Sequence, residues 1–308
     1  MSVVKTINSI GRKVGWLLND PAYVASYVIA DFFPDYFGRR QRSISNVPEL
    51  KEKFFILSFD CDTTKDFEVV EEVHARLQAL GIYPSYAVPG QLLTQGRDVY
   101  QRIHKTGAEF INHGYLSHTD YISDSRSYVS TVFYENLTHD EVRQDIVRGH
   151  QTIEEVLSYT PKGFRTPHFG TYEKKRYLSF LHSVLNDLNY EFSSSTTPIY
   201  GMWNGPLIRT QSGLFEIPVT GCFDYPGRIL DSWGFRFSPT RKFSEHDYGD
   251  QFNKLVKYFQ ESSGPGILNI YADPSQVYDW PLFFKCMANT HGLVNTSFEG
   301  LVKKVSHE

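Results

Sequence analysis

Short apolar runs alternate along this chain with longer segments that are predicted to be helical. The run Phe54–Phe59 has the length and the aromatic and branched content of a buried strand, and Glu109–Ile111 and Ile267–Ala272 are further examples. The predicted helices are Asp66–Leu80, Thr138–Leu157, Glu173–Leu188, His246–Glu261 and Pro281–Thr290. This alternation predicts an α/β fold in which a mostly parallel sheet closes into a barrel, with active residues at the carboxyl ends of its strands.

The amino-terminal part of the chain is predicted to be a helical extension rather than a membrane span. Val14–Phe33 has the length of a span, but Asn19–Pro21 and Asp31 interrupt it, which favours two short helices. We expect no cleaved secretory signal, because a compact apolar core with a small-residue cleavage site is missing. Aromatic residues followed by Arg39 and Arg40 can lie on a membrane surface, although packing of the helices on the domain is the favoured alternative.

Length and composition agree with one soluble domain. The chain has 308 residues, of which 41% are hydrophobic, so we expect a helical extension at residues 1–50 and a single domain at residues 51–308. The formal net charge is −4 without a broad basic field, which excludes nucleic acid as a partner. The three cysteines, Cys61, Cys222 and Cys286, lack metal-type spacing and predict reduced thiols in a cytoplasmic protein.

Two acids follow the strand predicted at Phe54–Phe59. Side chains alternate faces along a strand, so Asp60 and Asp62 point one way and Cys61 points the other. In this geometry one carboxylate can bind a metal while the other accepts a proton from a metal-bound water. An ordinary acidic loop is the alternative, because acids are common after strands.

Two histidines, His113 and His118, follow the strand predicted at Glu109–Ile111. They lie five residues apart, which is not the spacing of one helical face, so they require a loop or a helix start, where Gly114 relaxes the backbone. Two imidazoles and one carboxylate suit zinc and leave coordination positions open for water and substrate. A chance pair is the alternative, since the chain has 11 histidines.

A third polar cluster, at residues 163–170, enters a loop that Pro167 stiffens. Beside Asp60, the arginine of this cluster, Arg165, would keep the pKa of that acid low enough for it to act as a base. A surface arginine next to a turn is the alternative. Together the three clusters predict the site of a divalent-metal hydrolase.

Aromatic residues are concentrated in a part of the chain predicted to be loops. The members of this group are Phe223, Tyr225, Trp233, Tyr278 and Trp280. Flat rings can stack on the apolar faces of sugars, and we select Trp233 for this role, with Asp224 or Asp231 bonding sugar hydroxyls. Packing of the rings in the core or in loops is the favoured alternative.

Taken in order, these segments resemble the polysaccharide deacetylase family from about Phe54 to Lys304. Residues 58–62 resemble the first motif of the family in its Asp-x-Asp form, residues 112–118 the metal-binding motif, and residues 163–167 the third motif. Gly213–Val219 is similar to a segment that is common in bacterial members. The resemblance implies an α/β fold of the deacetylase type, a distorted (β/α) barrel.

The resemblance also implies a role for each matched residue. The residues that it places in the metal site are Asp62, His113 and His118, with zinc as the expected metal and cobalt or manganese as alternatives. It makes Asp60 the base and Arg165 its brace, and it implies that Pro167 and His168, in the following loop, contact the substrate. The family usually has three residues between its two histidines, whereas this chain has four.

The chain departs from the family where the acid is expected. The family usually ends its last strand in a His-Pro pair whose histidine protonates the leaving amine, but here the strand ends in Asp273 and Pro274. An unperturbed aspartate, with a pKa of about 3.9, is ionised at neutral pH. Burial or a neighbouring carboxylate can raise that pKa, so Asp273 is the first candidate. The alternatives are His168, His246, His291 or no acid.

We therefore predict a metal-dependent N-deacetylase that acts on an N-acetylated sugar in a cytoplasmic pathway building a polysaccharide or glycolipid. One alternative keeps the chemistry and changes the substrate, as in deformylation of a lipid-linked aminosugar or cleavage of another C–N amide bond. The other is a catalytically impaired sugar-binding protein with the same fold, which Asp273 and the longer histidine spacing favour. The intact charged cluster argues against it, because desolvated charges cost stability.

Overall fold

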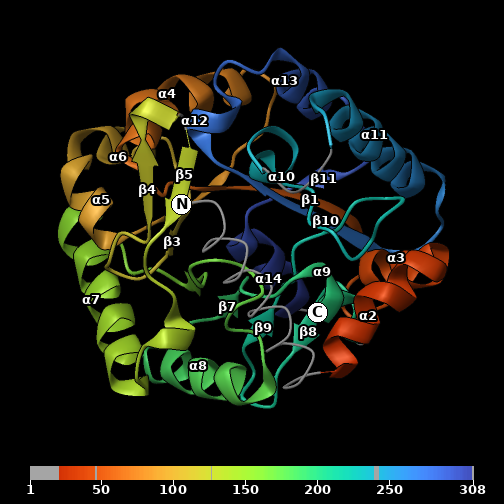
Figure 1. The fold of residues 1–308 in the computed structure, drawn as a ribbon, viewed down its shortest axis with the longest axis horizontal. Helices are drawn as coiled ribbons and strands as arrows, with labels where there is room; N and C mark the ends of the chain where they lie inside the picture. Colours follow the sequence, from red (N-terminus) through yellow and green to blue (C-terminus); the bar gives the residue numbers. More distant parts are fainter. Residues whose placement is uncertain (1–20, 46, 126, 239–242, 307–308) are drawn as a thin grey trace.

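The core of the protein is one curled β-sheet surrounded by helices (Figure 1). The structure, a computed structural model, describes residues 21–45, 47–125, 127–238 and 243–306. The strands of the main sheet are β1 (Lys53–Asp60), β2 (Ser85–Val88), β3 (Phe110–Asn112), β6 (Gly163–Phe164), β7 (Phe192–Ser193), β8 (Ile208–Arg209), β9 (Phe215–Glu216), β10 (Gly266–Ala272) and β11 (Val294–Asn295). Three of them, β1, β3 and β10, lie within one residue of their predicted positions.

The sheet is parallel along most of its length and curls toward closure. Its order is β10-β1-β2-β3-β6-β7-β9-β8, only β8 runs antiparallel to its neighbour β9 within that order, and β11 pairs with β1. Hydrogen bonds cross between the residues after β9 and strand β10. There the Asn269 amide Nδ2 donates to the carbonyls of Ile217 and Pro218 at 3.2 and 3.0 Å. The predicted α/β distorted barrel is therefore confirmed.

Helices cover the outer face of this sheet (Figure 1). The described helices from Thr64 onward are α4 (Thr64–Gln78), α5 (Gly90–Gln95), α6 (Arg97–His104), α7 (His139–Leu157), α8 (Lys175–Asp187), α9 (Pro198–Asn204), α10 (Ser232–Arg236), α11 (Glu245–Glu261), α12 (Pro274–Val277), α13 (Pro281–Met287) and α14 (Phe298–Ser306). Four of the five predicted helices, now α4, α7, α8 and α11, have both ends within two residues of their predicted positions. The fifth, α13, ends three residues before the predicted Thr290, because the chain turns there toward Gly292 at φ 85°.

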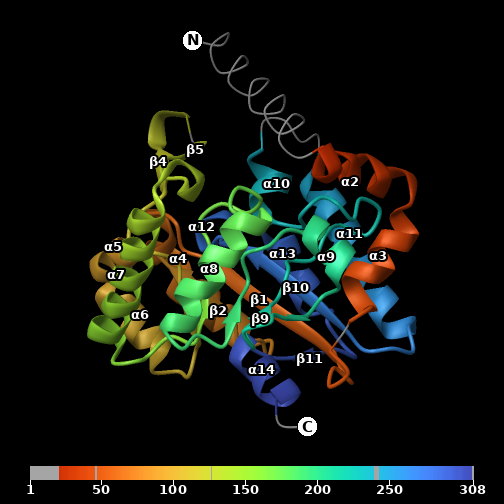
Figure 2. The same cartoon turned by 90° about the horizontal axis from the view of Figure 1, so that it is seen from below.

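Side chains of β1 alternate between two apolar cores, as the strand period requires. Phe55, Leu57 and Phe59 belong to the core under the outer helices. Phe54 and Ile56 face the barrel interior, where they join Phe298 of α14 in a second core. The far end of the barrel is closed by α14, whose first backbone N–H groups are bound by the buried Glu109 carboxylate (Figure 2).

A small hairpin and two short 3₁₀ turns complete the fold. Strands β4 (Thr119–Ile122) and β5 (Ser127–Ser130) form a separate antiparallel sheet that projects from the side opposite α14 (Figure 2). The 3₁₀ turns are Ser123–Ser125 and Tyr134–Asn136. The sequence analysis predicted none of these three elements, which are short and carry weak periodicity.

The amino-terminal extension packs on the domain as two helices, α2 (Pro21–Phe32) and α3 (Pro34–Ser43). The prediction placed two helices within Val14–Phe33, but Val14–Asp20 lies outside the described residues and the second helix comes after Phe33. Pro34 opens α3, as proline does in a first turn. Packing on the domain is confirmed, and membrane contact stays a prediction. Among the described helices, none has the length and apolar character needed to cross a bilayer.

Candidate active site

The polar clusters meet at the carboxyl ends of the parallel strands, as predicted. Asp60 ends β1, His113 follows β3, Arg165 follows β6 and Asp273 follows β10. A cavity of about 240 Å³ opens at this edge. Its lining residues are Asp60, Asp62, Thr119, Tyr128, Ser130, His168, Phe169, Ile229, Asp231, Trp233, Tyr271, Asp273 and Gln276.

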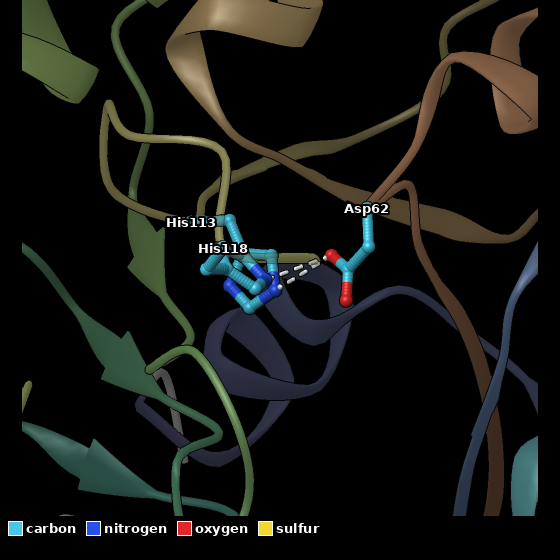
Figure 3. A group of neighbouring side chains, drawn as sticks. All are labelled: Asp62, His113 and His118. Atoms are coloured by element: carbon cyan, nitrogen blue, oxygen red, sulfur yellow. Dashed lines mark hydrogen bonds and ion pairs between the residues drawn. The ribbon is translucent and has the colours of Figure 1, made fainter. Parts of the chain in front are cut away.

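Three of the predicted ligands converge on one point beside this cavity (Figure 3). The Oδ1 atom of Asp62 lies 3.0 Å from Nε2 of His118 and 3.3 Å from Nε2 of His113. Two ligands about 2.0–2.1 Å from a tetrahedral zinc would lie about 3.3 Å apart, so these spacings suit such an ion. Burial raises the pKa of Asp62, but the two imidazoles outweigh it and hold that pKa well below its usual range.

The hydrogen bonds around His113 suit a metal ligand. Burial lowers the pKa of its ring, but Asp62 and then Asp60 outweigh burial and raise that pKa overall. Its Nδ1–H donates to the carbonyl of Arg165 at 2.8 Å, so in the neutral ring Nε2 carries the lone pair. That buried Nε2 faces Asp62 without the geometry of a hydrogen bond. A lone pair opposite a carboxylate oxygen is unfavourable unless a cation lies between them, and a carbonyl that orients the ligand histidine is typical of metal sites. The three residues therefore fit a divalent metal such as zinc.

The longer histidine spacing is accommodated by a tightly held loop. Gly114 has φ 78°, and a Cβ there would collide with Asp145 and with the hydroxyl of Tyr134. The Asp145 carboxylate accepts a hydrogen bond from the Leu116 N–H at 2.9 Å. The role predicted for Gly114 thus agrees with its backbone conformation, and the extra residue leaves both imidazoles directed at Asp62.

The second predicted pair, Asp60 and Arg165, lies directly beside the metal ligands. Nη1 of Arg165 donates to Oδ1 of Asp60 at 2.6 Å, and the guanidinium is fully buried. Its other side-chain hydrogen bonds are to Ser194, whose carbonyl accepts from Nε at 3.2 Å and whose hydroxyl lies 3.3 Å from Nη2. Because the arginine is held on both sides, it orients Asp60 toward the cavity.

Asp273 lines the cavity and is held by a short chain of polar contacts. Its carboxylate accepts a hydrogen bond from the Gln276 amide, and Gln276 in turn accepts one from the Ser232 hydroxyl at 2.8 Å. Burial and then the nearby carboxylates, Asp62 first, raise the pKa of Asp273 well above its usual value. An aspartate in these surroundings is a suitable proton donor at neutral pH.

The histidine alternatives to Asp273 are less suitable as acids. His246 and His291 are exposed and are not among the residues that line the cavity. His168 does line it, in a left-handed conformation at φ 57°, with Nε2 3.1 Å from the carbonyl of His118. Burial and the neighbouring His118 lower the pKa of His168 to about 3, so its ring is neutral at physiological pH. The adjacent Pro167, which was expected to contact the substrate, is buried and is not among the residues that line the cavity.

The structure separates the predicted aromatic group. Trp233 lines the cavity, beside Asp231, which accepts a hydrogen bond from the Tyr271 hydroxyl at 3.2 Å. Trp280 is buried in the core instead, and Asp224 forms an ion pair with Lys254 at the surface. In this part of the chain, the side chains that line the cavity are those of Ile229, Asp231 and Trp233.

Two parts of the site escaped the sequence analysis. Thr119, Tyr128 and Ser130 reach the cavity from the β4–β5 hairpin. A buried polar segment at residues 193–197 supports Arg165 from behind. No local motif marks either of them, because their positions depend on contacts with distant parts of the chain.

Comparisons with known proteins agree with this fold. Residues 48–192 match the family model described as polysaccharide deacetylase. A solved structure described as a polysaccharide deacetylase from Mycobacterium smegmatis is 16% identical, with 86% of this chain and 93% of that chain covered and a TM-score of 0.60. One from Pseudomonas aeruginosa PAO1 is 11% identical, with 83% and 91% covered and a TM-score of 0.60.

The same fold also occurs in the structure of Puue allantoinase. That protein is 10% identical, with 83% of this chain and 91% of that chain covered and a TM-score of 0.59. At such identities these structures establish the fold alone. No curated protein matches this chain.

Proposed function

We propose that this chain, which belongs to the polysaccharide deacetylase family through residues 48–192, is a metal-dependent N-deacetylase of N-acetylated sugars. The observation that carries the proposal is the adjacency of two units beside one cavity. A carboxylate held by a buried arginine, Asp60 with Arg165, lies beside the group formed by Asp62, His113 and His118. A base beside a metal site is one arrangement that can hydrolyse an unactivated amide.

In this proposal Asp62, His113 and His118 hold the metal, with zinc expected and cobalt or manganese as alternatives. When bound, such an ion supplies a Lewis acid that polarises a carbonyl oxygen and lowers the pKa of water. The tautomer of His113 is set by its bond to the Arg165 carbonyl, so its Nε2 is ready to bind without rearrangement.

The protein's own groups then move the protons. Asp60 accepts a proton from the water that adds to the acetyl carbonyl carbon, and Arg165 keeps its carboxylate aimed at that position. Asp273 donates a proton to the nitrogen as the C–N bond breaks, which releases acetate and a free amine. General acid–base assistance of this kind contributes about 10²- to 10⁴-fold to the rate.

The cavity supports a sugar as the substrate. Trp233 offers an apolar ring at the wall, and Asp231 offers a carboxylate that can accept hydrogen bonds from hydroxyl groups. Three buried, free cysteines are compatible with a reducing compartment, which supports a cytoplasmic place in polysaccharide or glycolipid biosynthesis.

The test is acetate release from N-acetylated mono- and oligosaccharides by the zinc-loaded protein. We expect release that falls at least about 100-fold in Asp60→Asn, because the base is lost, and that is unchanged in Asp140→Asn, an exposed acid at the start of α7. Formate release from an N-formylated sugar alone would identify a deformylase. Sugar binding without any hydrolysis would identify a binding protein and overturn the proposal.

A further inference from the structure

A fully buried carboxylate outside the cavity is connected to both halves of the site. Glu216 of β9 has 0% of its surface exposed and is not among the cavity-lining residues. Burying a charge is costly unless hydrogen bonds compensate it, and an apolar side chain of similar size would avoid that cost. The groups that Glu216 binds therefore indicate what it does.

Glu216 anchors the polar segment at residues 193–197. Its Oε1 accepts hydrogen bonds from the Ser195 N–H and the Thr196 hydroxyl, both at 2.9 Å. Its Oε2 lies 3.2 Å from Nε2 of His182 on helix α8, which covers it on the outer side. One carboxylate thus ties strand β9, helix α8 and the segment together.

The segment in turn holds Thr166 and Arg165 in place. The Ser195 hydroxyl accepts a hydrogen bond from the Thr166 N–H at 3.0 Å. The neighbouring Ser194 contacts the Arg165 guanidinium through its carbonyl and its hydroxyl. Arg165 binds Asp60 through Nη1 and orients His113 through its carbonyl. The polar segment and Arg165 therefore lie between Glu216 and both the proposed base and a proposed metal ligand.

We propose that Glu216 is a positioning residue, which acts through Ser194 and Ser195 to hold Arg165 and Thr166 in place for the reaction. This inference rests on the proposed function, because the groups that it positions are the proposed base and a proposed ligand. Outer residues of this kind typically change metal affinity or activity about 10- to 100-fold when they are lost.

A matched control exists on the same segment. Glu173 is also a buried carboxylate, and it accepts hydrogen bonds from the N–H and the hydroxyl of Thr197 at 2.7 and 2.9 Å. These contacts lie at the end of the segment away from Ser194. Loss of Glu173 removes a buried carboxylate of the same type while the contacts to Arg165 and Thr166 remain.

The experiment compares Glu216→Met, Glu216→Gln and Glu173→Met. We expect Glu216→Met to lower kcat about 10- to 100-fold with KM within about threefold, and to weaken zinc affinity about tenfold by calorimetry. Glu216→Gln keeps an acceptor oxygen and should restore kcat to within about fivefold of the parent. Glu173→Met should keep kcat and zinc affinity within about threefold, although its melting temperature falls. If Glu216→Met does not fold, Ser195→Ala replaces it, because it removes the hydroxyl that holds the Thr166 N–H. We expect this variant to lower kcat as well.

A further measurement separates this inference from the proposed function. In the metal-free protein, the His113 ring N–H bonded to the Arg165 carbonyl gives an NMR signal that His113→Ala identifies by its loss. We expect Glu216→Met to shift or broaden that signal and Glu173→Met to preserve it. If no acetylated sugar is hydrolysed, the proposed function fails while this signal still tests the positioning. Equal effects of Glu216→Met and Glu173→Met on kcat, zinc affinity and the His113 signal would overturn the inference.

Discussion

Arg165 contacts both the proposed base and a proposed metal ligand, through different atoms. Its guanidinium holds the Asp60 carboxylate, and its carbonyl accepts the Nδ1–H of His113. The side chain is fully buried, so removal of any partner would leave an uncompensated polar group, which costs about 1–3 kcal/mol or more for a charge. The position of the proposed base and that of a proposed metal ligand are therefore coupled through one residue.

The raised pKa of Asp273 predicts a pH dependence. Burial and neighbouring carboxylates favour its protonated form, so the acid stays able to donate well above its ordinary pKa of about 3.9 and is lost as pH rises through the raised value. We expect kcat to fall on the alkaline side for this reason. Asp273→Asn should lower kcat at least about 100-fold at neutral pH and remove that alkaline limb.

The measurement is kcat for acetate release across the pH range, with Asp98→Asn, an exposed acid on α6, as the control. An alkaline limb that persists unchanged in Asp273→Asn would show that another group supplies the proton.

Sequence reasoning works for residues whose role depends on near neighbours. Asp60 and Asp62 are recognisable because the strand before them sets their directions, and Arg165 because it lies in a short motif. Tyr128 and Glu216 are not recognisable in this way. Tyr128 lines the cavity only because the β4–β5 hairpin places it there. Glu216 reaches Ser195 because β7 and β9 pair with each other.

At the scale of elements, helix α3 of the amino-terminal extension is joined to the barrel by buried contacts. The Gln41 amide donates to the carbonyls of Pro198 and Pro226 at 3.1 and 2.8 Å and accepts from the Gly221 N–H at 2.9 Å. The Arg42 guanidinium lies near the rings of Phe223 and Tyr258, with centroid distances of 4.8 and 4.7 Å. These contacts join α3 to the first residue of α9, to the segment that follows β9 and to helix α11.

Gln41→Ala should therefore destabilise the whole domain. Three buried backbone groups would lose their partner, so we expect a decrease of about 2–4 kcal/mol in the free energy of unfolding. Gln211→Ala, at an exposed position, should change it by less than about 0.5 kcal/mol. Urea unfolding measures both. An unchanged midpoint in Gln41→Ala would mean that α3 is not part of the cooperative unit.

The long helices were predicted and the shortest strands were not, for a physical reason. Helices carry local signals, such as the capping box in which Thr138 and Glu141 bind each other's backbone at the start of α7. Strands β6, β7 and β9 have two residues each, and their pairing partners lie far along the chain. Such strands form only as part of the curled sheet, so no local sequence pattern predicts them.

At the scale of the whole molecule, the curled sheet gathers distant segments at one rim. The loops after β1, β3, β6 and β10 meet there because parallel strands end on the same side. Helix α14 closes the other end, which keeps the apolar interior separate from the polar rim (Figure 2). The alternation of strands and helices was sufficient to predict this plan. The contacts between α3 and the barrel were not predictable one by one, since each of them joins residues that are far apart in the sequence.

The central claim is that Asp62, His113 and His118 bind a divalent metal, and metal content tests it most directly. Elemental analysis of the purified protein, reloaded with zinc and desalted, should give close to one equivalent. The double variant His113→Ala, His118→Ala should lose that metal, while His246→Ala, His291→Ala, which removes two exposed imidazoles, should keep it. Absence of metal from the parent after reloading, or equal metal in both double variants, would contradict the account.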